Sequence, residues 1–80
     1  MSRDPDNGAF PELYANFFKI GYNAAEFLLD FGRRFGEEPE KFLQRIVTSP
    51  GHAKALSRLL QKSVGEYEAR FGKIPEDEES

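Results

Sequence analysis

The clearest pattern in the chain is a helical stripe of apolar residues near its C-terminus. Apolar side chains recur there every three or four residues: Ala53, Leu56, Leu60, Val64, Tyr67 and Phe71, with Leu59 widening the stripe. Ser49 suits the N-cap, and Pro50 suits the first helical position, where no amide donor is needed. Gly72 suits the position after the helix, and Pro75 prevents its resumption. The pattern predicts an amphipathic helix of about 21 residues, roughly 32 Å long.

Two earlier stretches show the shorter alternation that is typical of strands. In residues 13–22, one strand face carries every second residue: Tyr14, Asn16, Phe18, Ile20 and Tyr22. Phe17 lies on the opposite face, so both faces of this strand carry aromatic side chains. Residues 42–48 form another short strand that ends before Pro50, because proline disfavours a helical conformation for the residue before it. Residues 32–41 contain two glycines and a proline, and we expect a loop there.

Residues 23–31 fit two different elements. As a strand, every second residue from Phe27 to Phe31 faces inward. As a helix, Asn23 is an N-cap with Glu26 three residues later, and periodicity alone favours this alternative. Gly32 would interrupt such a helix early. The residues by themselves leave the choice between strand and helix open.

Several blocks of residues follow a fixed order over residues 13–74. They are Tyr14-Ala-Asn-Phe17, Glu26-Phe-Leu-Leu-Asp-Phe-Gly32, Ser49-Pro-Gly-His-Ala-Lys54, Leu56, Leu60, Tyr67-Glu68 and Phe71-Gly72. This order, YxNF…EFxLDFG…SPxHAKxLxxxLxxxxxxYExxFG, resembles a family of small uncharacterised prokaryotic proteins with a domain of unknown function. The resemblance implies a strand at residues 27–31, because such proteins commonly have a β-branched residue near Leu28. Gly51 departs from the family pattern, which more often has an acidic or amide residue there, and this affects only the strength of the helix start.

Together these elements predict an α+β fold, a short antiparallel β-meander of two or three strands followed by one long C-terminal amphipathic helix packed on the sheet. We expect the apolar stripe of the helix to be buried on these strand residues: Phe18, Ile20, Phe27, Leu29 and Ile46 or Val47. Residues 10–75 are expected to form a single domain. A disordered N-terminal arm is expected at 1–9 and an acidic disordered tail at 76–80.

Composition and charge narrow the classes of function. The chain has 80 residues, a net charge of −3, eight Phe and no Cys, which removes disulfides and thiolate metal sites. Residues 76–80 carry −4 and residues 1–9 carry −1, so residues 10–75 carry +2. A nearly neutral domain is unlike the strongly basic surface of most nucleic-acid binders. The first residues lack the apolar stretch of a secretory signal and no segment suits a membrane span, so we expect a cytoplasmic protein without membrane contact. The family resemblance implies that the protein is bacterial.

The candidate chemistry does not assemble into an active site. His52 is the one histidine, and zinc would require about three protein ligands. Glu26 and Asp30 on one strand would be about 13 Å apart, too far to act on one bond. One of these carboxylates is expected to pair with Lys19 or Arg45 on a neighbouring strand. We therefore expect no catalytic residues, no cofactor, no metal and no enzymatic activity.

Binding is the function that remains. A helix of this length overhangs a sheet only 10–15 Å wide (about 4.8 Å per strand), which leaves its C-terminal turns uncovered. We expect a homodimer formed through the sheet edge or the overhanging helix end, with these interface residues: Phe17, Val64, Tyr67 and Phe71. The predicted function is a non-enzymatic interaction or assembly module, and an unknown protein partner is an alternative to self-association.

A second hypothesis is a nucleic-acid-associated or regulatory protein. Lys54, Arg58 and Lys62 repeat every four residues and would form a basic row on one helix face, a pattern that phosphate contacts use. A charged row opposite an apolar stripe is more often simply the solvated face of a helix. We therefore rank nucleic-acid binding below self-association.

Overall fold

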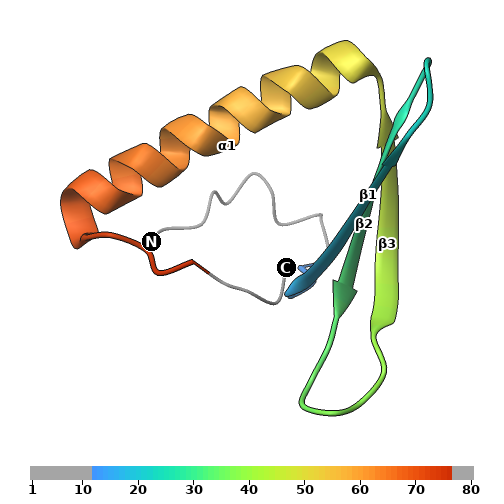
Figure 1. Ribbon diagram of the computed structural model, residues 1–80, viewed down its shortest axis with the longest axis horizontal. Coiled ribbons are helices and arrows are strands. Elements are labelled where there is room, and N and C mark those ends of the chain that lie inside the picture. The colour runs from blue at the N-terminus through green and yellow to red at the C-terminus, as the bar shows by residue number, and fades with distance from the viewer. Residues whose placement is uncertain (1–11, 77–80) are drawn as a thin grey trace.

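The computed structural model describes residues 12–76, which form three strands followed by one helix (Figure 1). The elements are β1 (Phe17–Tyr22), β2 (Phe27–Arg33), β3 (Lys41–Thr48) and α1 (Pro50–Phe71). The strands pair in sequence order, and each is antiparallel to the next. The predicted α+β fold, an antiparallel meander followed by one C-terminal helix, is confirmed. The expected arm at 1–9, and all but the first residue of the expected tail at 76–80, lie outside the described residues.

The segment that fitted either a helix or a strand is strand β2, as the family resemblance implied. Asn23 has the role of a turn residue. Its Oδ1 atom accepts hydrogen bonds from the backbone N–H groups of Ala25 at 2.8 Å and Glu26 at 2.9 Å. The backbone N–H of Asn23 also donates to the carbonyl oxygen of Glu26, at 3.0 Å. The pattern that resembled a helix cap therefore closes the hairpin between β1 and β2.

Gly32 lies at an irregularity in the pairing of β2 with β3, and it is the one buried residue among residues 12–76. A Cβ atom at this position would lie 2.8 Å from the carbonyl oxygen of Lys41 and 3.2 Å from Cδ1 of Phe42. Because both strands extend into the region expected to be a loop, the connection is shorter than predicted and spans residues 34–40.

Helix α1 begins and ends where the sequence indicates. The Ser49 hydroxyl accepts a hydrogen bond from the backbone N–H of His52 at 3.1 Å, and Pro50 occupies the first turn. At the other end, Gly72 has a φ of 103°, and its N–H donates to the carbonyl oxygen of Glu68 at 3.0 Å. Local signals for capping therefore define both ends of the helix.

The expected packing of α1 across the sheet of its own chain is not observed. The helix leaves the end of β3 and diverges from the sheet (Figure 1), and it has no contact with any strand comparable to the contacts between strands. The large apolar residues of its stripe, from Leu56 to Phe71, are 40–68% exposed. The connection explains this difference. Only Ser49 separates β3 from α1, it is extended (φ −80°, ψ 160°), and Pro50 disfavours the conformations that would turn the chain back.

The consequence is that residues 12–76 enclose no internal core. No hydrophobic side chain among residues 12–76 is buried, and large exposed hydrophobic residues occur on β1, on β3 and along the whole of α1. Among residues 12–76, β2 contacts both β1 and β3, whereas the helix makes no comparable contact with any strand.

Candidate functional site

The register of the strands sorts their side chains onto two faces of the sheet. One face, which we name the uncharged face, consists of Phe18, Ile20, Tyr22, Phe27, Leu29, Phe31, Ile46 and Thr48, and the pair of Arg33 and Lys41 continues it where β2 ends and β3 begins. Aromatic pairs join β1 to β2 there, with ring centroids 5.8 Å apart for Phe18 and Phe31 and 5.5 Å apart for Tyr22 and Phe27. Before the terminal pair of Arg33 and Lys41, this face carries no ionisable group apart from the Tyr22 hydroxyl, so it is the apolar side of the sheet.

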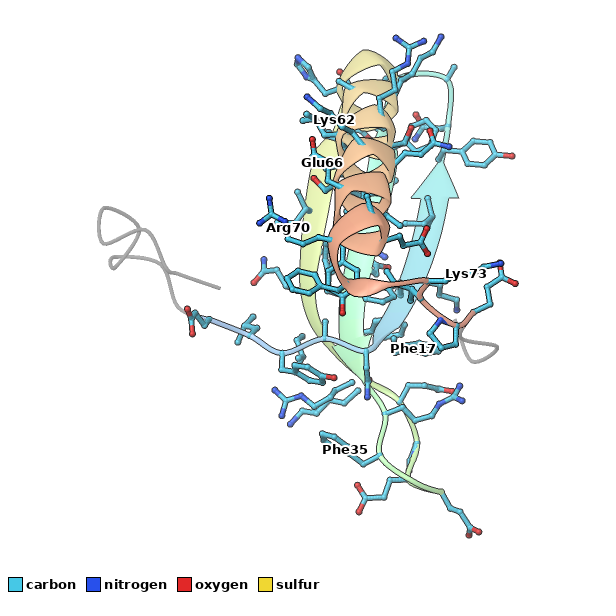
Figure 2. The ribbon with its side chains drawn as sticks, turned by 90° about the vertical axis from the view of Figure 1, so that its left-hand side faces the viewer. Phe17, Phe35, Lys62, Glu66, Arg70 and Lys73 are labelled. Carbon is cyan, nitrogen blue, oxygen red and sulfur yellow. The ribbon has the colours of Figure 1, made fainter. Side chains whose placement is uncertain are left out.

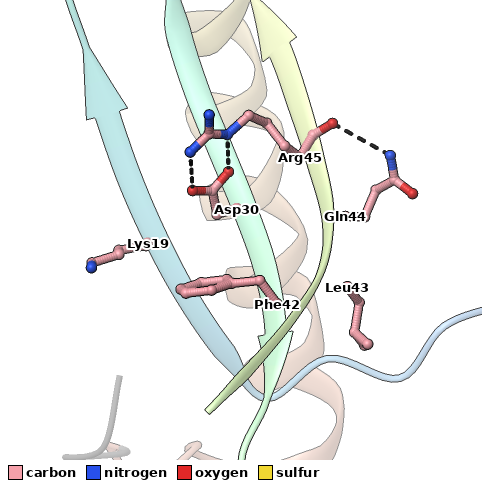
Figure 3. Close-up of a pocket in the computed structure, with 6 residues that line it drawn as sticks. All are labelled: Lys19, Asp30, Phe42, Leu43, Gln44 and Arg45. Carbon is pink, nitrogen blue, oxygen red and sulfur yellow. Dashed lines mark hydrogen bonds and ion pairs between the residues drawn. The ribbon is translucent and has the colours of Figure 1, made fainter.

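The opposite face, which we name the charged face, consists of Phe17, Lys19, Gly21, Leu28, Asp30, Gly32, Phe42, Arg45 and Val47. The Arg45 guanidinium donates two hydrogen bonds to the Asp30 carboxylate, from Nε at 2.7 Å and from Nη2 at 2.9 Å (Figure 3). Phe17 and Phe42 meet across Gly32, with ring centroids 5.5 Å apart. The main polar and aromatic groups of this face therefore find partners within the chain.

The ion pair on the charged face changes the titration of both partners. The hydrogen bonds from Arg45 lower the pKa of Asp30, and the positive charges of Arg45 and Lys19 act in the same direction, while burial opposes them. The same hydrogen bonds raise the pKa of Arg45. The prediction that a β2 carboxylate pairs across strands is confirmed, with Arg45 as the partner of Asp30. A carboxylate held ionised in this way is a poor proton donor at neutral pH.

The pair lies in a depression that is open to solvent. It is lined by Lys19, Asp30, Phe42, Leu43, Gln44 and Arg45. His52 is exposed at the start of α1, and Glu26 lies in the hairpin turn before β2. Within residues 12–76, no three His, Cys, Asp or Glu side chains are grouped as metal ligands would be.

The predicted interface residues fall in two separate places. Val64, Tyr67 and Phe71 lie on the exposed stripe of α1, where the rings of Tyr67 and Phe71 are 5.0 Å apart. Phe17 lies on the charged face, and α1 is behind the sheet when this face is viewed (Figure 3). Phe17 is half-buried, and the Arg34 guanidinium lies 4.9 Å from its ring centroid. The structure therefore groups the three helix residues but sets Phe17 apart from them.

The predicted basic row also lies on α1. Lys54, Arg58 and Lys62 are all exposed, and none of them forms an ion pair within the described part of the chain. Lys62, Glu66 and Arg70 lie along one side of the helix (Figure 2). Positive charge on this helix therefore alternates with acidic residues toward its C-terminal half.

Two residues that position the charged face were not singled out from the sequence. The side chain of Asn16 extends the β1–β2 pairing, because its Nδ2 donates to the Arg34 carbonyl at 3.1 Å and its Oδ1 accepts the Arg34 N–H at 2.9 Å. Gly32 leaves room for Phe17 and Phe42 to meet. Both residues belong to the blocks that carry the family resemblance, and this was the signal that could have found them.

No helix formed by residues 12–76 combines the length and the apolar character that a bilayer span requires. A search of curated proteins and a search of solved structures each found no match to the chain. Residues 2–76 match the model of a family described as protein of unknown function (DUF3467). This match confirms the expected resemblance to a family with a domain of unknown function. Because the match covers nearly the whole sequence, the chain belongs to the DUF3467 family.

Proposed function

We propose that this protein is a non-enzymatic assembly module that works as a homodimer. One observation carries the proposal: no hydrophobic side chain among residues 12–76 is buried. The large apolar side chains of α1 and of the uncharged face are instead exposed in whole or in part. Apolar surface in contact with water is unfavourable, and large exposed patches usually mark interfaces. Association is the route by which such a chain acquires a core.

The covalent and ionic features of the chain support the same proposal. There is no cysteine, so no disulfide compensates for the missing core. The ion pairs of Arg45 with Asp30 and of Arg34 with Glu40 lie at the surface, and pairs of this kind stabilise a fold only weakly. Burial of apolar surface between chains is therefore the main stabilising contribution that remains.

The absence of enzymatic activity is part of the proposal. It is supported by the open depression on the charged face, where Asp30 is already engaged by Arg45, and by the isolated position of His52. Enzymatic sites are usually concave and bring several perturbed ionisable groups together. The described residues offer one perturbed pair on an open surface.

The first experiment is a measurement of absolute mass by light scattering at low and high salt. We expect twice the mass of one chain at both salt concentrations, because an apolar interface is not screened by ions. A single-chain mass, together with a cooperative unfolding transition, contradicts the homodimer.

A charge introduced into the helix stripe tests the interface. Phe71→Glu is expected to shift the mass toward a single chain, because it places a carboxylate on the exposed apolar stripe. Ala69→Glu is the matched control, since Ala69 is exposed on α1 outside that stripe. Phe17→Glu tests the other predicted interface residue. An unchanged mass for both Phe variants places the interface elsewhere.

Nucleic-acid binding is the second candidate function. The observation in its favour is the row of Lys54, Arg58 and Lys62, which is exposed and without ion pairs in residues 12–76. The test is electrophoretic retardation of single-stranded and duplex DNA and RNA at low salt, with a triple alanine variant of the row as control. Phosphate contacts weaken steeply with salt, so retardation should fall as salt rises and should disappear in the variant. No retardation at low salt removes this function.

A further inference from the structure

We infer that two copies of this chain cover one another reciprocally, so that α1 of each copy packs on the uncharged face of the other copy's sheet. This inference rests on the proposed homodimer and adds to it the pairing of surfaces. Within residues 12–76, no other segment covers either of the two surfaces. Their chemistry, their dimensions and the connection between them all favour this arrangement.

The chemistry of the two surfaces matches. The stripe of α1 contains no charged side chain, and the charged side chains of the uncharged face, Arg33 and Lys41, lie only where β2 ends and β3 begins. A helix that covers the rest of this face buries no unpaired charge. Covering the charged face with an apolar helix would instead bury Lys19 and desolvate the pair of Asp30 and Arg45, which is costly. The uncharged face is therefore the one that an apolar helix can cover.

The dimensions of the two surfaces also match. Helix α1 has 22 residues and is about 33 Å long, and the longest strand, β3, has 8 residues and spans about 27 Å. Three strands spaced about 4.8 Å apart extend about 10 Å between the outer strand axes, which is close to the diameter of one helix. One helix thus covers one such sheet. Two copies supply two helices and two sheets, which closes the assembly with two-fold symmetry.

The short connection between β3 and α1 keeps the helix away from its own sheet, and this favours a second copy as the partner. Ser49 alone joins the two elements, and its carbonyl oxygen accepts the Ala53 N–H at 2.9 Å while its hydroxyl accepts the His52 N–H. These bonds and Pro50 hold the helix start in one direction relative to β3. The helix lies on the side of the uncharged face but diverges from it (Figures 1 and 3), so that face is left open to another helix.

The uncovered area suits a stable dimer. Large side chains on the two surfaces are 40–75% exposed: Phe18, Ile20, Tyr22, Ile46, Leu56, Leu59, Leu60, Val64, Tyr67 and Phe71. With roughly 200 Å² for each fully exposed side chain, the uncovered apolar surface is on the order of 1,000 Å² per chain. Reciprocal cover would bury about 2,000 Å² in total, which lies within the range of stable homodimers.

Site-directed disulfide formation tests the pairing of surfaces, because the chain has no cysteine of its own. Chains with Leu29→Cys on the uncharged face are mixed with tagged chains that carry Leu56→Cys, Leu60→Cys or Val64→Cys on α1. The mixtures are unfolded, refolded together and oxidised. We expect a disulfide-linked species that contains both chains for at least one helix position, because a disulfide requires Cα atoms within about 7 Å of each other.

Leu28→Cys is the matched control, since Leu28 precedes Leu29 on β2 and lies on the charged face. Linkage is expected to be lost with this variant. If Leu29→Cys does not fold, Ile46→Cys and its neighbour Val47→Cys on β3 provide the same comparison.

The outcomes distinguish a failure of the reciprocal packing alone from a failure of the homodimer. Linkage to Leu28 rather than Leu29, or none to either position while the mass of two chains persists, overturns the reciprocal packing and leaves the homodimer standing. A chain with both Leu29→Cys and Leu60→Cys that closes its own disulfide as a monomer shows that α1 folds back onto its own sheet, and this overturns both. A single-chain mass for the unmodified protein also overturns both.

Discussion

The two faces of the sheet are built from alternate residues of the same three strands, yet they differ in where their partners come from. On the charged face, Asp30 pairs with Arg45, and Phe17 meets Phe42 across Gly32. On the uncharged face, neighbouring rings touch, but Tyr22 still exposes three quarters of its surface. A face with charges thus completes its contacts within one chain and remains in water, whereas the apolar face keeps large side chains that no part of residues 12–76 covers.

The largest effect is expected when a carboxylate is placed on each face of the sheet in turn, because only one face is proposed to be covered by a second copy. Ile46 and Val47 are neighbours on β3 with similar exposure, 46% and 50%, but they lie on opposite faces. Ile46→Asp is expected to abolish assembly and to lower the free energy of unfolding by about 3 kcal/mol or more, because it puts a charge into the proposed core. Val47→Asp should cost less than about 1 kcal/mol, as surface substitutions usually do. Mass and urea unfolding would be measured together, and equal effects at the two positions would refute the distinction between the faces.

The second largest effect is expected at Gly32, which holds the charged face together. In Gly32→Ala, the new methyl group would lie 2.8 Å from the Lys41 carbonyl oxygen, so the backbone at the irregular pairing must shift. We expect a loss of about 2 kcal/mol in the free energy of unfolding. Gly21→Ala is the control, because Gly21 is on the same face and a Cβ there meets no atom within 4 Å. Equal urea midpoints for the two variants would contradict the inference that the close approach of Lys41 and Phe42 to this position requires Gly32.

A third test leaves both faces of the sheet unchanged and concerns the helix. Gly72→Ala is expected to lower the free energy of unfolding by about 1 kcal/mol, because the φ of 103° at this position strains any residue with a side chain. Gly65→Ala, in the middle of α1 where a Cβ meets nothing within 4 Å, should have the opposite effect and stabilise by about 1 kcal/mol. Thermal unfolding followed by circular dichroism would measure both. A destabilised Gly65→Ala variant would indicate that the interface extends to that side of α1.

The smallest effect is expected at the ion pair. Because the folded pKa of Asp30 lies below its ordinary value of 3.8, the pair contributes stability above that value and loses it as pH falls through the lowered pKa. Asp30→Asn should therefore be slightly destabilising at neutral pH, with the difference from wild type vanishing at acidic pH. Urea midpoints measured between pH 2 and pH 7 would show this convergence. The mass should stay unchanged, and dissociation of Asp30→Asn would place the interface on the charged face.

Local features of the fold were predictable because they depend on neighbouring residues. The stripe, the Ser49 cap and Gly72 all indicate the same helix, and the structure agrees to within a residue. Alternation also predicted that Phe17 opposes Phe18. It predicted a cross-strand pair between one of two carboxylates and Lys19 or Arg45, and the structure has this pair as Asp30 with Arg45. Each of these inferences needs only the periods of helices and strands and the chemistry of helix ends.

Other features depend on information that a residue pattern does not contain. Asn23 followed by Glu26 suits a helix cap and a hairpin turn equally well, so local chemistry could not decide the identity of β2. The irregular pairing at Gly32 arises between two strands and has no signature in either strand alone. An apolar stripe indicates that a helix packs against another apolar surface, but it does not indicate whether that surface belongs to the same chain. The expectation that α1 packs on its own sheet failed for this reason, since the length of the Ser49 connection decides the direction of the helix.

The order in which contacts form follows from the way this chain is connected. The strand contacts within one chain join sequence neighbours, β1 with β2 and β2 with β3, through short connections. Hairpins of this kind form on a timescale of about 1–10 µs. If the apolar surfaces are covered by a second copy, the final step of folding is an encounter between two chains, and its rate rises with their concentration. The amount of protein that a cell makes would then set both the speed of folding and the fraction of chains that are folded.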